Sequence, residues 1–255
     1  MSWSAQQYVK FEDERTRPVR DLLAAVPTAE PRRAIDLGCG PGNSTEVLLG
    51  RFPGAAVRGL DSSEEMVKAA RKRLPDLTFE MGDIDTWTAD EPVDVIVANA
   101  VLQWLPDHLS TLPRLAGQLS DGGSLAVQMP DNLDQDYHKL MREVATGGAW
   151  RDKLAAAVAA RKDLPAPAGY YSLLRPECRR VDVWRTIYHH PLAGVDAVVE
   201  WFKGSALWPY LEPLSEDERI AYLTEYRAGI ARAYPLQSDG VVLLPFPRLF
   251  IVATR

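Results

Sequence analysis

A glycine-rich turn between a short apolar run and a helix start constrains this chain more than any other feature. The run Ala34-Ile35-Asp36-Leu37 leads into glycines at positions 38, 40 and 42, and Ser44-Thr45 follows as a helix start. Strand, tight turn and helix in that order are typical of a nucleotide-binding corner in an α/β sheet. Glycine permits a positive φ and has no Cβ, so a bulky ligand can approach the start of the helix.

The spacing of the glycines narrows the class of ligand. A dinucleotide fingerprint is G-x-G-x-x-G, with pyrophosphate on the helix N-terminus. This chain has G-x-G-x-G, with Asp36 two residues before the first glycine. A carboxylate there disfavours pyrophosphate and tolerates a ligand that carries an ammonium and a sulfonium. The stretch resembles the glycine-rich motif of class I S-adenosylmethionine (SAM) methyltransferases, and a nicotinamide oxidoreductase or a plain glycine-rich turn is the weaker interpretation.

Composition excludes several other classes of protein. The 255 residues are 46% hydrophobic and 25% charged, which is ordinary for one globular domain with insertions. A formal net charge of −6 argues against a nucleic-acid-binding surface. Cys39 and Cys178 form no C-x-x-C pair, and the adjacent His189-His190 lacks the company of a metal-ligand set. We therefore expect a cytoplasmic protein with no metal, no nucleic acid and no membrane as partners.

An acid follows the second predicted strand, Ala56–Leu60. Asp61 stands roughly 20 residues past the turn, where a carboxylate at a strand end can accept hydrogen bonds from both ribose hydroxyls. Its alternative role is a helix N-cap. Ser62 and Glu65 have the spacing of a capping box for the next helix, so Asp61 is expected to be left for a ligand.

A second acid follows the third predicted strand, Leu77–Met81. Asp83 can accept from an adenine amine while Ile84 packs on the ring, and the alternative for Asp83 is a turn-forming role. With the turn and the end of the fourth strand, these residues complete the predicted cofactor site: Asp36, Gly38, Cys39, Gly40, Gly42, Asp61, Ser62, Asp83, Ile84 and Asn99.

The fourth predicted strand, Val93–Ala100, is nearly continuous in apolar residues, as a strand buried on both faces must be. In a doubly wound sheet the residues just past this strand face the ligand crevice. Gln103 and Trp104 are therefore expected to line a substrate slot and to orient the reactants, with a core position as the alternative for Trp104.

The remaining pattern predicts an open sheet with helical additions. We expect a helix over 19–26 after Pro18, a helical face over 109–119 ended by Gly122-Gly123, and strands at 124–128, 181–188 and 248–254, with 245–247 as a bend. The domain organisation predicted is an N-terminal lid and helix (1–30), a SAM-binding core (31–130), a helical cap (131–178), and C-terminal strands (179–255) that carry a helical insertion at about 192–236.

Four blocks extend the resemblance over nearly the whole chain. They are 36–45 (DLGCGPGNST), 99–108 (NAVLQWLPDH), 126–132 (AVQMPDN) and 246–253 (FPRLFIVA), and together they resemble the trans-aconitate 2-methyltransferase family. Residues 147–168 carry no motif of it. The resemblance implies a Rossmann-like class I methyltransferase of the α/β class, with an open, mostly parallel seven-stranded sheet and an antiparallel last strand. It also implies monomethyl esterification of trans-aconitate with SAM as donor and S-adenosylhomocysteine as product.

The chemistry of the substrate supports that expectation. A carboxylate is ionised at neutral pH, so no general acid or base is required and orientation carries the catalysis. A tricarboxylate needs cationic and hydroxyl donors, for which the candidates are Tyr8, Arg15, Arg17, Gln103, Trp104, Tyr170, Tyr171, Arg185, His189 and Arg248. The alternatives are methylation of another polycarboxylate, a phenol or a quinone precursor, or a SAM-binding module without turnover. A monomer or weak homo-oligomer is expected.

Overall fold

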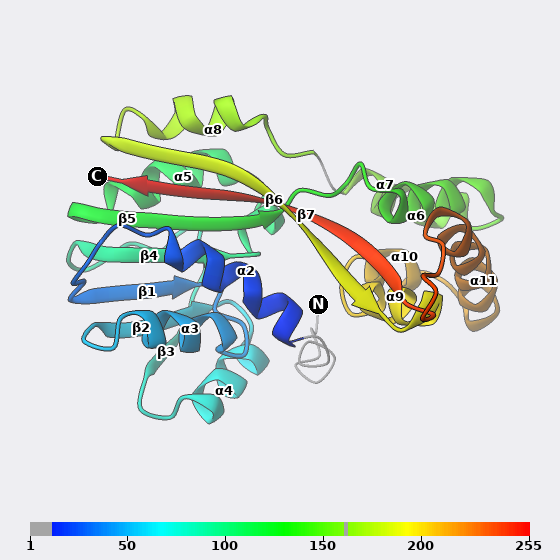
Figure 1. The fold of residues 1–255 in the computed structure, drawn as a ribbon, viewed down its shortest axis with the longest axis horizontal. Helices are drawn as coiled ribbons and strands as arrows, with labels where there is room; N and C mark the ends of the chain where they lie inside the picture. The colour runs from blue at the N-terminus through cyan, green and yellow to red at the C-terminus, as the bar shows by residue number, and fades with distance from the viewer. Residues whose placement is uncertain (1–11, 161–162) are drawn as a thin grey trace. The chain divides into compact units, whose positions relative to one another are not determined.

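Seven strands form one sheet. In the order in which they lie side by side, they are β3 (Thr78–Met81), β2 (Ala56–Asp61), β1 (Arg33–Leu37), β4 (Val93–Asn99), β5 (Leu119–Pro130), β7 (Val242–Thr254) and β6 (Arg180–Leu192) (Figure 1). The computed structural model describes residues 12–160 and 163–255. β1 to β5 pair in parallel, and β7 runs antiparallel to β5. The predicted fold class, including its antiparallel last strand, is confirmed.

The chain divides into two compact units. The sheet unit holds the described residues up to Pro130, together with Pro165–Thr186 and Arg248–Arg255. The helical unit holds the described residues of Asp131–Leu164, together with Ile187–Pro247. β6 and β7 each contribute residues to both units. The predicted stretch 131–178 is thus divided between the units near residue 164, and the predicted domain organisation stays a prediction.

Helices belong to one unit or the other. The sheet unit has α2 (Glu12–Ala24), α3 (Asn43–Arg51), α4 (Glu64–Arg73), η1 (Leu102–Trp104, a 3-10 turn), α5 (His108–Gly117) and α8 (Pro167–Leu174). The helical unit has α6 (Asp136–Gly147), α7 (Arg151–Ala159), α9 (Gly194–Lys203), α10 (Trp208–Leu211) and α11 (Glu216–Ala233). α2 packs on α3, and α5 packs on α8. In the helical unit α6 packs on α11, which begins with a capping box formed by Ser215 and Glu218.

The central strand β4 explains the position of the core. Its residues Val93–Ala98 are buried, between β1 on one edge and β5 on the other. A strand that is covered on both faces buries the side chains that point to either face. Because burial of apolar side chains stabilises the fold, the sequence of such a strand is a nearly unbroken apolar run. The carboxyl end of β4, at Asn99, therefore lies among the carboxyl ends of the neighbouring parallel strands.

The structure of the last strand, β7, contradicts one prediction. Residues 245–247 were expected to form a bend, but they lie within the continuous strand β7. In a strand, the N–H groups of residues two apart point to the same edge, so Pro245 and Pro247 remove donors from one edge only. Pro247 still accepts a hydrogen bond from the Asp131 N–H at 3.0 Å. Two prolines at this spacing are therefore compatible with a strand.

Two helix ends also differ from the prediction. Gly122-Gly123 does not end the helix before β5: α5 stops at Gly117, and Leu119 already pairs with Val93 in the sheet. The glycines instead serve an irregularity in β5, because Gly122 has a φ of 77° and a Cβ on Gly123 would lie 3.0 Å from the Val93 carbonyl oxygen. In α2, Pro18 lies inside the helix, which begins upstream at Glu12.

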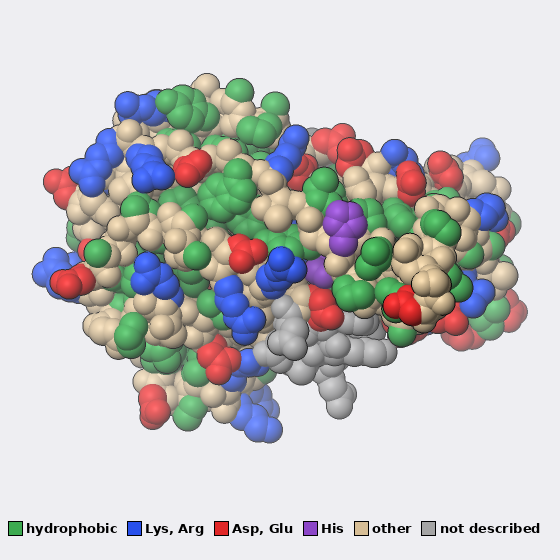
Figure 2. Space-filling model, in the orientation of Figure 1, with side chains coloured by type: hydrophobic (Ala, Val, Ile, Leu, Met, Phe, Trp, Pro, Cys, Tyr) green, Lys and Arg blue, Asp and Glu red, His purple; other side chains and the backbone are tan. Residues whose placement is uncertain are grey.

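The surface of the sheet unit carries both signs of charge. Figure 2 shows Lys and Arg side chains interspersed with Asp and Glu over its visible face. Within the described residues, no helix is long and apolar enough to cross a bilayer.

Candidate active site

The glycine turn is fastened to the end of β2. Gly38 and Cys39 both donate their backbone N–H to the Leu60 carbonyl, at 2.7 and 3.0 Å, and Gly40 donates to Asp61 Oδ2 at 2.9 Å. Gly38 has a φ of 72°, and a Cβ there would lie 2.4 Å from Val101 Cγ2. The first glycine is therefore required both by backbone conformation and by the close approach of the segment after β4.

Asp36 lies beneath the turn. Its side chain is fully buried, and Oδ2 accepts from the Ser44 hydroxyl at 2.6 Å and the Thr45 hydroxyl at 2.7 Å. Burial raises the pKa of Asp36 to about 6, although these two hydrogen bonds lower it. Oδ1 has no hydrogen-bond partner. Asp36 thus holds the first turn of α3 from below.

A cavity of about 660 Å³ opens above the turn at the carboxyl ends of β1, β2 and β4. Eight of the ten predicted cofactor residues form its wall: Gly38, Cys39, Gly40, Asp61, Ser62, Asp83, Ile84 and Asn99. Asp36 and Gly42 are not part of it. Its size and mixed polarity are those of a site for one small organic ligand.

Cys39 presents its backbone to this cavity rather than a reactive thiol. The side chain is 2% exposed and packs in an apolar cluster with Val67, Ala70 and Phe79. Burial, with the nearby charges of Asp36 and Asp61, raises the pKa of the Cys39 thiol far above its ordinary value. The thiol is therefore protonated and packed, so Cys39 serves the turn as a small apolar residue.

Three aspartates contribute to the cavity wall: Asp61, Asp83 and Asp85. Asp61 accepts from the Ser63 N–H through Oδ1 at 2.9 Å, while its Oδ2 accepts from Gly40. Asp83 Oδ1 accepts from the Asp85 N–H at 2.9 Å, so the turn-forming role weighed for Asp83 is present. Each carboxylate oxygen can accept more than one hydrogen bond, so these contacts leave capacity toward the cavity.

The capping box predicted at Ser62 and Glu65 is wrong. The N-cap of α4 is Ser63, whose hydroxyl accepts from the Met66 N–H. Asp61 determines where α4 begins because its carboxylate accepts from the Ser63 N–H. The helix therefore begins one residue later than predicted. Ser62 is left exposed in the cavity wall.

The segment after β4 closes another side of the cavity. Asn99, Ala100 and Val101 contribute to the wall, and so does Trp104, which is 41% exposed. Asn99 Oδ1 is buried without a hydrogen-bond partner. Gln103 differs from the expectation of a slot-lining residue: its amide turns back and donates from Nε2 to the Ala100 carbonyl at 2.7 Å.

Among the polar wall residues that sequence reasoning missed, two are buried and have side-chain atoms without a hydrogen-bond partner. Thr16 on α2 and Asn43 at the start of α3 are 7% and 8% exposed, and the Thr16 hydroxyl and both Asn43 amide atoms have no hydrogen-bond partner. Asn43 lies directly after the glycine turn, a position that could have drawn attention to it. Thr16 carries no local signal, since only the packing of α2 on α3 brings it to the site.

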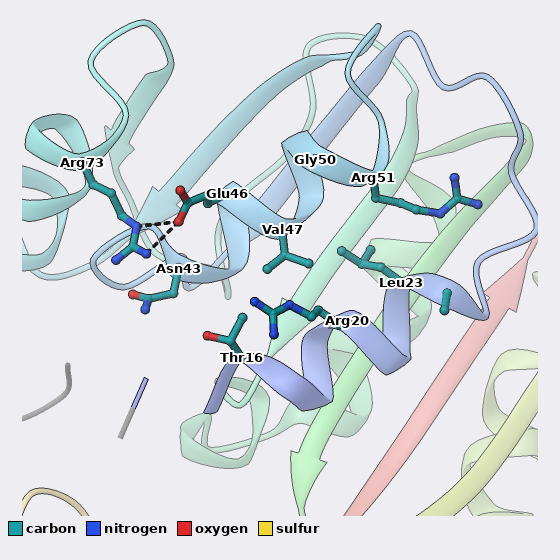
Figure 3. Close-up of a pocket in the computed structure, with 10 residues that line it drawn as sticks. Thr16, Arg20, Leu23, Asn43, Glu46, Val47, Gly50, Arg51 and Arg73 are labelled. Carbon is teal, nitrogen blue, oxygen red and sulfur yellow. Dashed lines mark hydrogen bonds and ion pairs between the residues drawn. The ribbon is translucent and has the colours of Figure 1, made fainter. Parts of the chain in front are cut away.

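A second cavity, of about 480 Å³, adjoins these two residues. Figure 3 shows it between α2 and α3, with Thr16, Arg20 and Asn43 on its sides and Arg73 held by Glu46 at one end. Thr16 and Asn43 line both cavities.

Arg248 is the one predicted substrate arginine with a described side chain that is buried, at 4% exposed. It donates from Nη1 to Gln128 Oε1 at 3.0 Å. Gln128 pairs with Asn99 across β4 and β5, and paired residues place their side chains on the same face of a sheet. Arg248 thus belongs to a buried polar row that reaches the cavity wall at Asn99.

The other substrate candidates occupy different positions. Arg17, Tyr171 and Arg185 are exposed in the sheet unit. Tyr170 is fully buried, and its hydroxyl lies 2.8 Å from His108 Nε2, so it is a core residue of α8 rather than a wall residue. His189 is exposed in the helical unit. Tyr8 and the side chain of Arg15 lie outside the described residues.

No cluster of three or more His, Cys, Asp or Glu side chains suited to a metal ion occurs in the part of the chain that the structure describes. In the cavity wall, the carboxylates of Asp61 and Asp83 accept hydrogen bonds from backbone N–H groups.

Comparison with known proteins agrees with this geometry. Residues 30–176 match the family model described as a methyltransferase domain. Trans-aconitate 2-methyltransferase from Rhodopseudomonas palustris (strain BisB18) is 54% identical over 253 residues, which cover 99% of each chain. The protein of the same name from Rhizobium leguminosarum bv. trifolii (strain WSM2304) is 55% identical over 255 residues and 100% of each chain.

Solved structures of distant proteins share the fold. The YcgJ protein from Bacillus subtilis is 11% identical, with a TM-score of 0.60 over 94% of this chain and 98% of that one. The plantazolicin methyltransferase BamL is 14% identical, with a TM-score of 0.52 over 98% and 90%. At identities this low, the similarity shows a shared fold alone. An identity above 50% over the full length, in contrast, shows membership of the same family. The chain therefore belongs to the trans-aconitate 2-methyltransferase family, on the class I methyltransferase fold.

Proposed function

We propose that this protein transfers the methyl group of SAM to a carboxylate of trans-aconitate and releases the monomethyl ester. The observation that carries the proposal is the 54% identity over 253 residues with a relative named trans-aconitate 2-methyltransferase. The small cavity at the carboxyl edge of the sheet supports it, because a donor and a small acid are the scale of ligand that it fits.

The wall of the cavity fits the donor chemically. Buried polar atoms without partners are costly unless a ligand satisfies them, and the wall has them at Thr16, Asn43 and Asn99. We propose that Asp61 binds the ribose hydroxyls, that Asp83 and Ile84 bind the adenine, and that Thr16 and Asn43 bind the amino-acid end. When bound, SAM supplies an electrophilic methyl group on a sulfonium, and S-adenosylhomocysteine remains.

The acceptor needs no base from the protein. A carboxylic acid has a pKa of roughly 4, so its oxygen is a nucleophile at neutral pH. The residues of the site then serve to align the carboxylate with the methyl group, an effect worth up to roughly 7–11 kcal/mol in favourable cases. We assign this alignment to the wall residues at and just past the end of β4, namely Asn99, Ala100, Val101 and Trp104.

Arg248 is the favoured partner of a substrate carboxylate. It is buried, bonded to Gln128, and on the sheet face that leads to Asn99. A guanidinium suits bidentate recognition of a carboxylate, and burial strengthens the attraction because solvent screening is weak there. A net charge of −6 makes the approach of a tricarboxylate dependent on such local cations.

The test measures transfer of a labelled methyl group from SAM to trans-aconitate, cis-aconitate, citrate, isocitrate and a phenol. We expect the highest kcat/KM with trans-aconitate, and we expect base to release the label from its product because the product is an ester. Higher kcat/KM for another acid would replace the substrate and keep the reaction, and transfer to the phenol alone would contradict carboxylate methylation. Tight SAM binding with no transfer would indicate a module without turnover.

A further inference from the structure

Ala100 adopts a strained backbone in the wall of the donor cavity. Its φ is 54°, and it is the one non-glycine residue with a positive φ in residues 12–160 and 163–255. An L-residue in this region brings its Cβ close to the backbone, and such a conformation persists only where neighbours impose it. Ala100 directly follows Asn99, at the carboxyl end of β4.

Two hydrogen bonds hold this residue, one on each side. The Ala100 N–H donates to the Gln128 carbonyl at 2.8 Å, which continues the ladder between β4 and β5. The Ala100 carbonyl accepts from Gln103 Nε2 at 2.7 Å. The other amide atom, Gln103 Oε1, is buried without a hydrogen-bond partner. The Gln103 amide is thus turned so that it donates to Ala100.

The conformation of Ala100 sets where its neighbours lie. Val101 comes so close to Gly38 that a Cβ on the glycine would be 2.4 Å from Val101 Cγ2. Asn99 and Val101 are both wall residues of the cavity. If Ala100 relaxed to a negative φ, the chain direction on either side of it would change, and this wall would move relative to the glycine turn.

We propose that Gln103 is a positioning residue that clamps Ala100 in its left-handed conformation and thereby holds Asn99 and Val101 in place at the donor site. The inference rests on the proposed function, since alignment of the two reactants is what it explains. Gln103 acts through Ala100 and through main-chain geometry, so a loss of the clamp should affect the rate more than the affinity for the nucleoside part of the donor.

The test is a double-mutant cycle between Gln103→Ala and Ala100→Gly. Glycine adopts a positive φ without strain, so Ala100→Gly makes the clamp unnecessary. We expect Gln103→Ala to lower kcat about tenfold in the native background, because a misplaced wall disturbs alignment. It should lower kcat less than about twofold in the Ala100→Gly background. The Kd of S-adenosylhomocysteine, measured by calorimetry, should change less than about twofold in each variant.

Gln118→Ala is the matched control. Gln118 also bonds the backbone with its side-chain amide, accepting from the Ala89 N–H at 3.0 Å, but it lies outside the cavity wall. Its loss should lower Tm by an amount similar to the loss of Gln103 and leave kcat unchanged. Gln103→Met keeps the length of the side chain but removes the hydrogen-bond donor. If Gln103→Ala fails to fold, we expect Gln103→Met to show the same loss of kcat.

Equal loss of kcat in both backgrounds, or no loss from Gln103→Ala, would overturn the clamp. If the native protein methylated none of the acids, the proposed function would fail separately. The free energy of unfolding would then test the clamp. Gln103→Ala should lower this free energy less in the Ala100→Gly background than in the native background. Additive effects of the two substitutions would reject it there.

Discussion

Asp61 accepts the backbone N–H of Gly40 at 2.9 Å, so the carboxylate at the end of β2 also fastens the glycine turn at the end of β1. One side chain therefore fixes the shape of the donor site and is available to the ligand. This double engagement makes Asp61 the position where a single substitution should affect donor affinity most.

Replacing Asp61 with Ala should weaken binding of S-adenosylhomocysteine by about 1.5–3 kcal/mol, the range for hydrogen bonds to a charged group. Calorimetry measures this directly. Asp90→Ala is the control, because Asp90 is exposed and stands outside the cavity wall. Equal affinity of the native protein and Asp61→Ala would remove Asp61 from the donor site.

The buried Asp36 predicts a pH dependence of stability. Its pKa is raised from an ordinary 3.8 to about 6, so the folded state holds a proton that the unfolded state has released between these values. Stability from this group is thus fully present below pH 4 and is lost as pH rises through 6. A shift of this size corresponds to roughly 3 kcal/mol.

Asp36→Asn keeps the shape and cannot ionise, so it isolates this effect. Urea unfolding of both proteins at pH 4, 5, 6 and 7 should show the stability of the variant relative to the native protein increasing with pH. A difference that stays constant across this range would mean that Asp36 has an ordinary pKa.

The rate of methyl transfer should be independent of pH near neutrality. The proposed nucleophile is already a carboxylate, so kcat should be flat from pH 6 to 8 and fall only at acid pH, where the substrate carboxylates become protonated. Steady-state assays with saturating SAM measure this. A tenfold rise per pH unit over that range would require a deprotonation step and would favour a phenolic substrate.

Substitution of Arg248 should separate substrate binding from donor binding. Arg248→Gln removes the charge and should raise KM for trans-aconitate at least tenfold, with the affinity for S-adenosylhomocysteine nearly unchanged. Arg232→Ala, an exposed arginine on α11, is the control for loss of one positive charge. Retention of the native KM would mean that another cation binds the substrate.

The first glycine should be the least replaceable one of the turn. Gly38→Ala combines a positive φ with a Cβ 2.4 Å from Val101, and should lower the free energy of unfolding by about 2 kcal/mol or more. Gly54→Ala is the matched control, since a Cβ there meets nothing within 4 Å and should change stability by less than about 0.5 kcal/mol. Similar effects of both substitutions would contradict the close approach.

The features that could be predicted from the sequence are those with a local chemical signature. The glycine turn, Asp61 at the end of β2 and Asp83 after β3 are predicted by motif and spacing, and all three contribute to one cavity wall. The apolar run of β4 has an equally direct physical cause, because the strand is covered on both faces.

Features that depend on which contact a side chain makes in the folded chain could not be predicted. The N-cap moved from Ser62 to Ser63 because Asp61 binds the Ser63 N–H. Gln103 was expected to face the substrate, but its amide binds a carbonyl whose direction follows from the φ of Ala100. Thr16 reaches the cavity only through the packing of α2, for which no short sequence pattern exists.

The position of β7 between β5 and β6 has a consequence for synthesis on the ribosome. β7 is the last of the seven strands in chain order, yet both of its edges are neighbours in the sheet. While the chain is still being translated, β5 has no partner on that side and β6 has no place in the sheet. The edge of β5 therefore stays unpaired until the segment that joins it to β6 leaves the exit tunnel, and an unpaired strand edge is a template for aggregation during that interval.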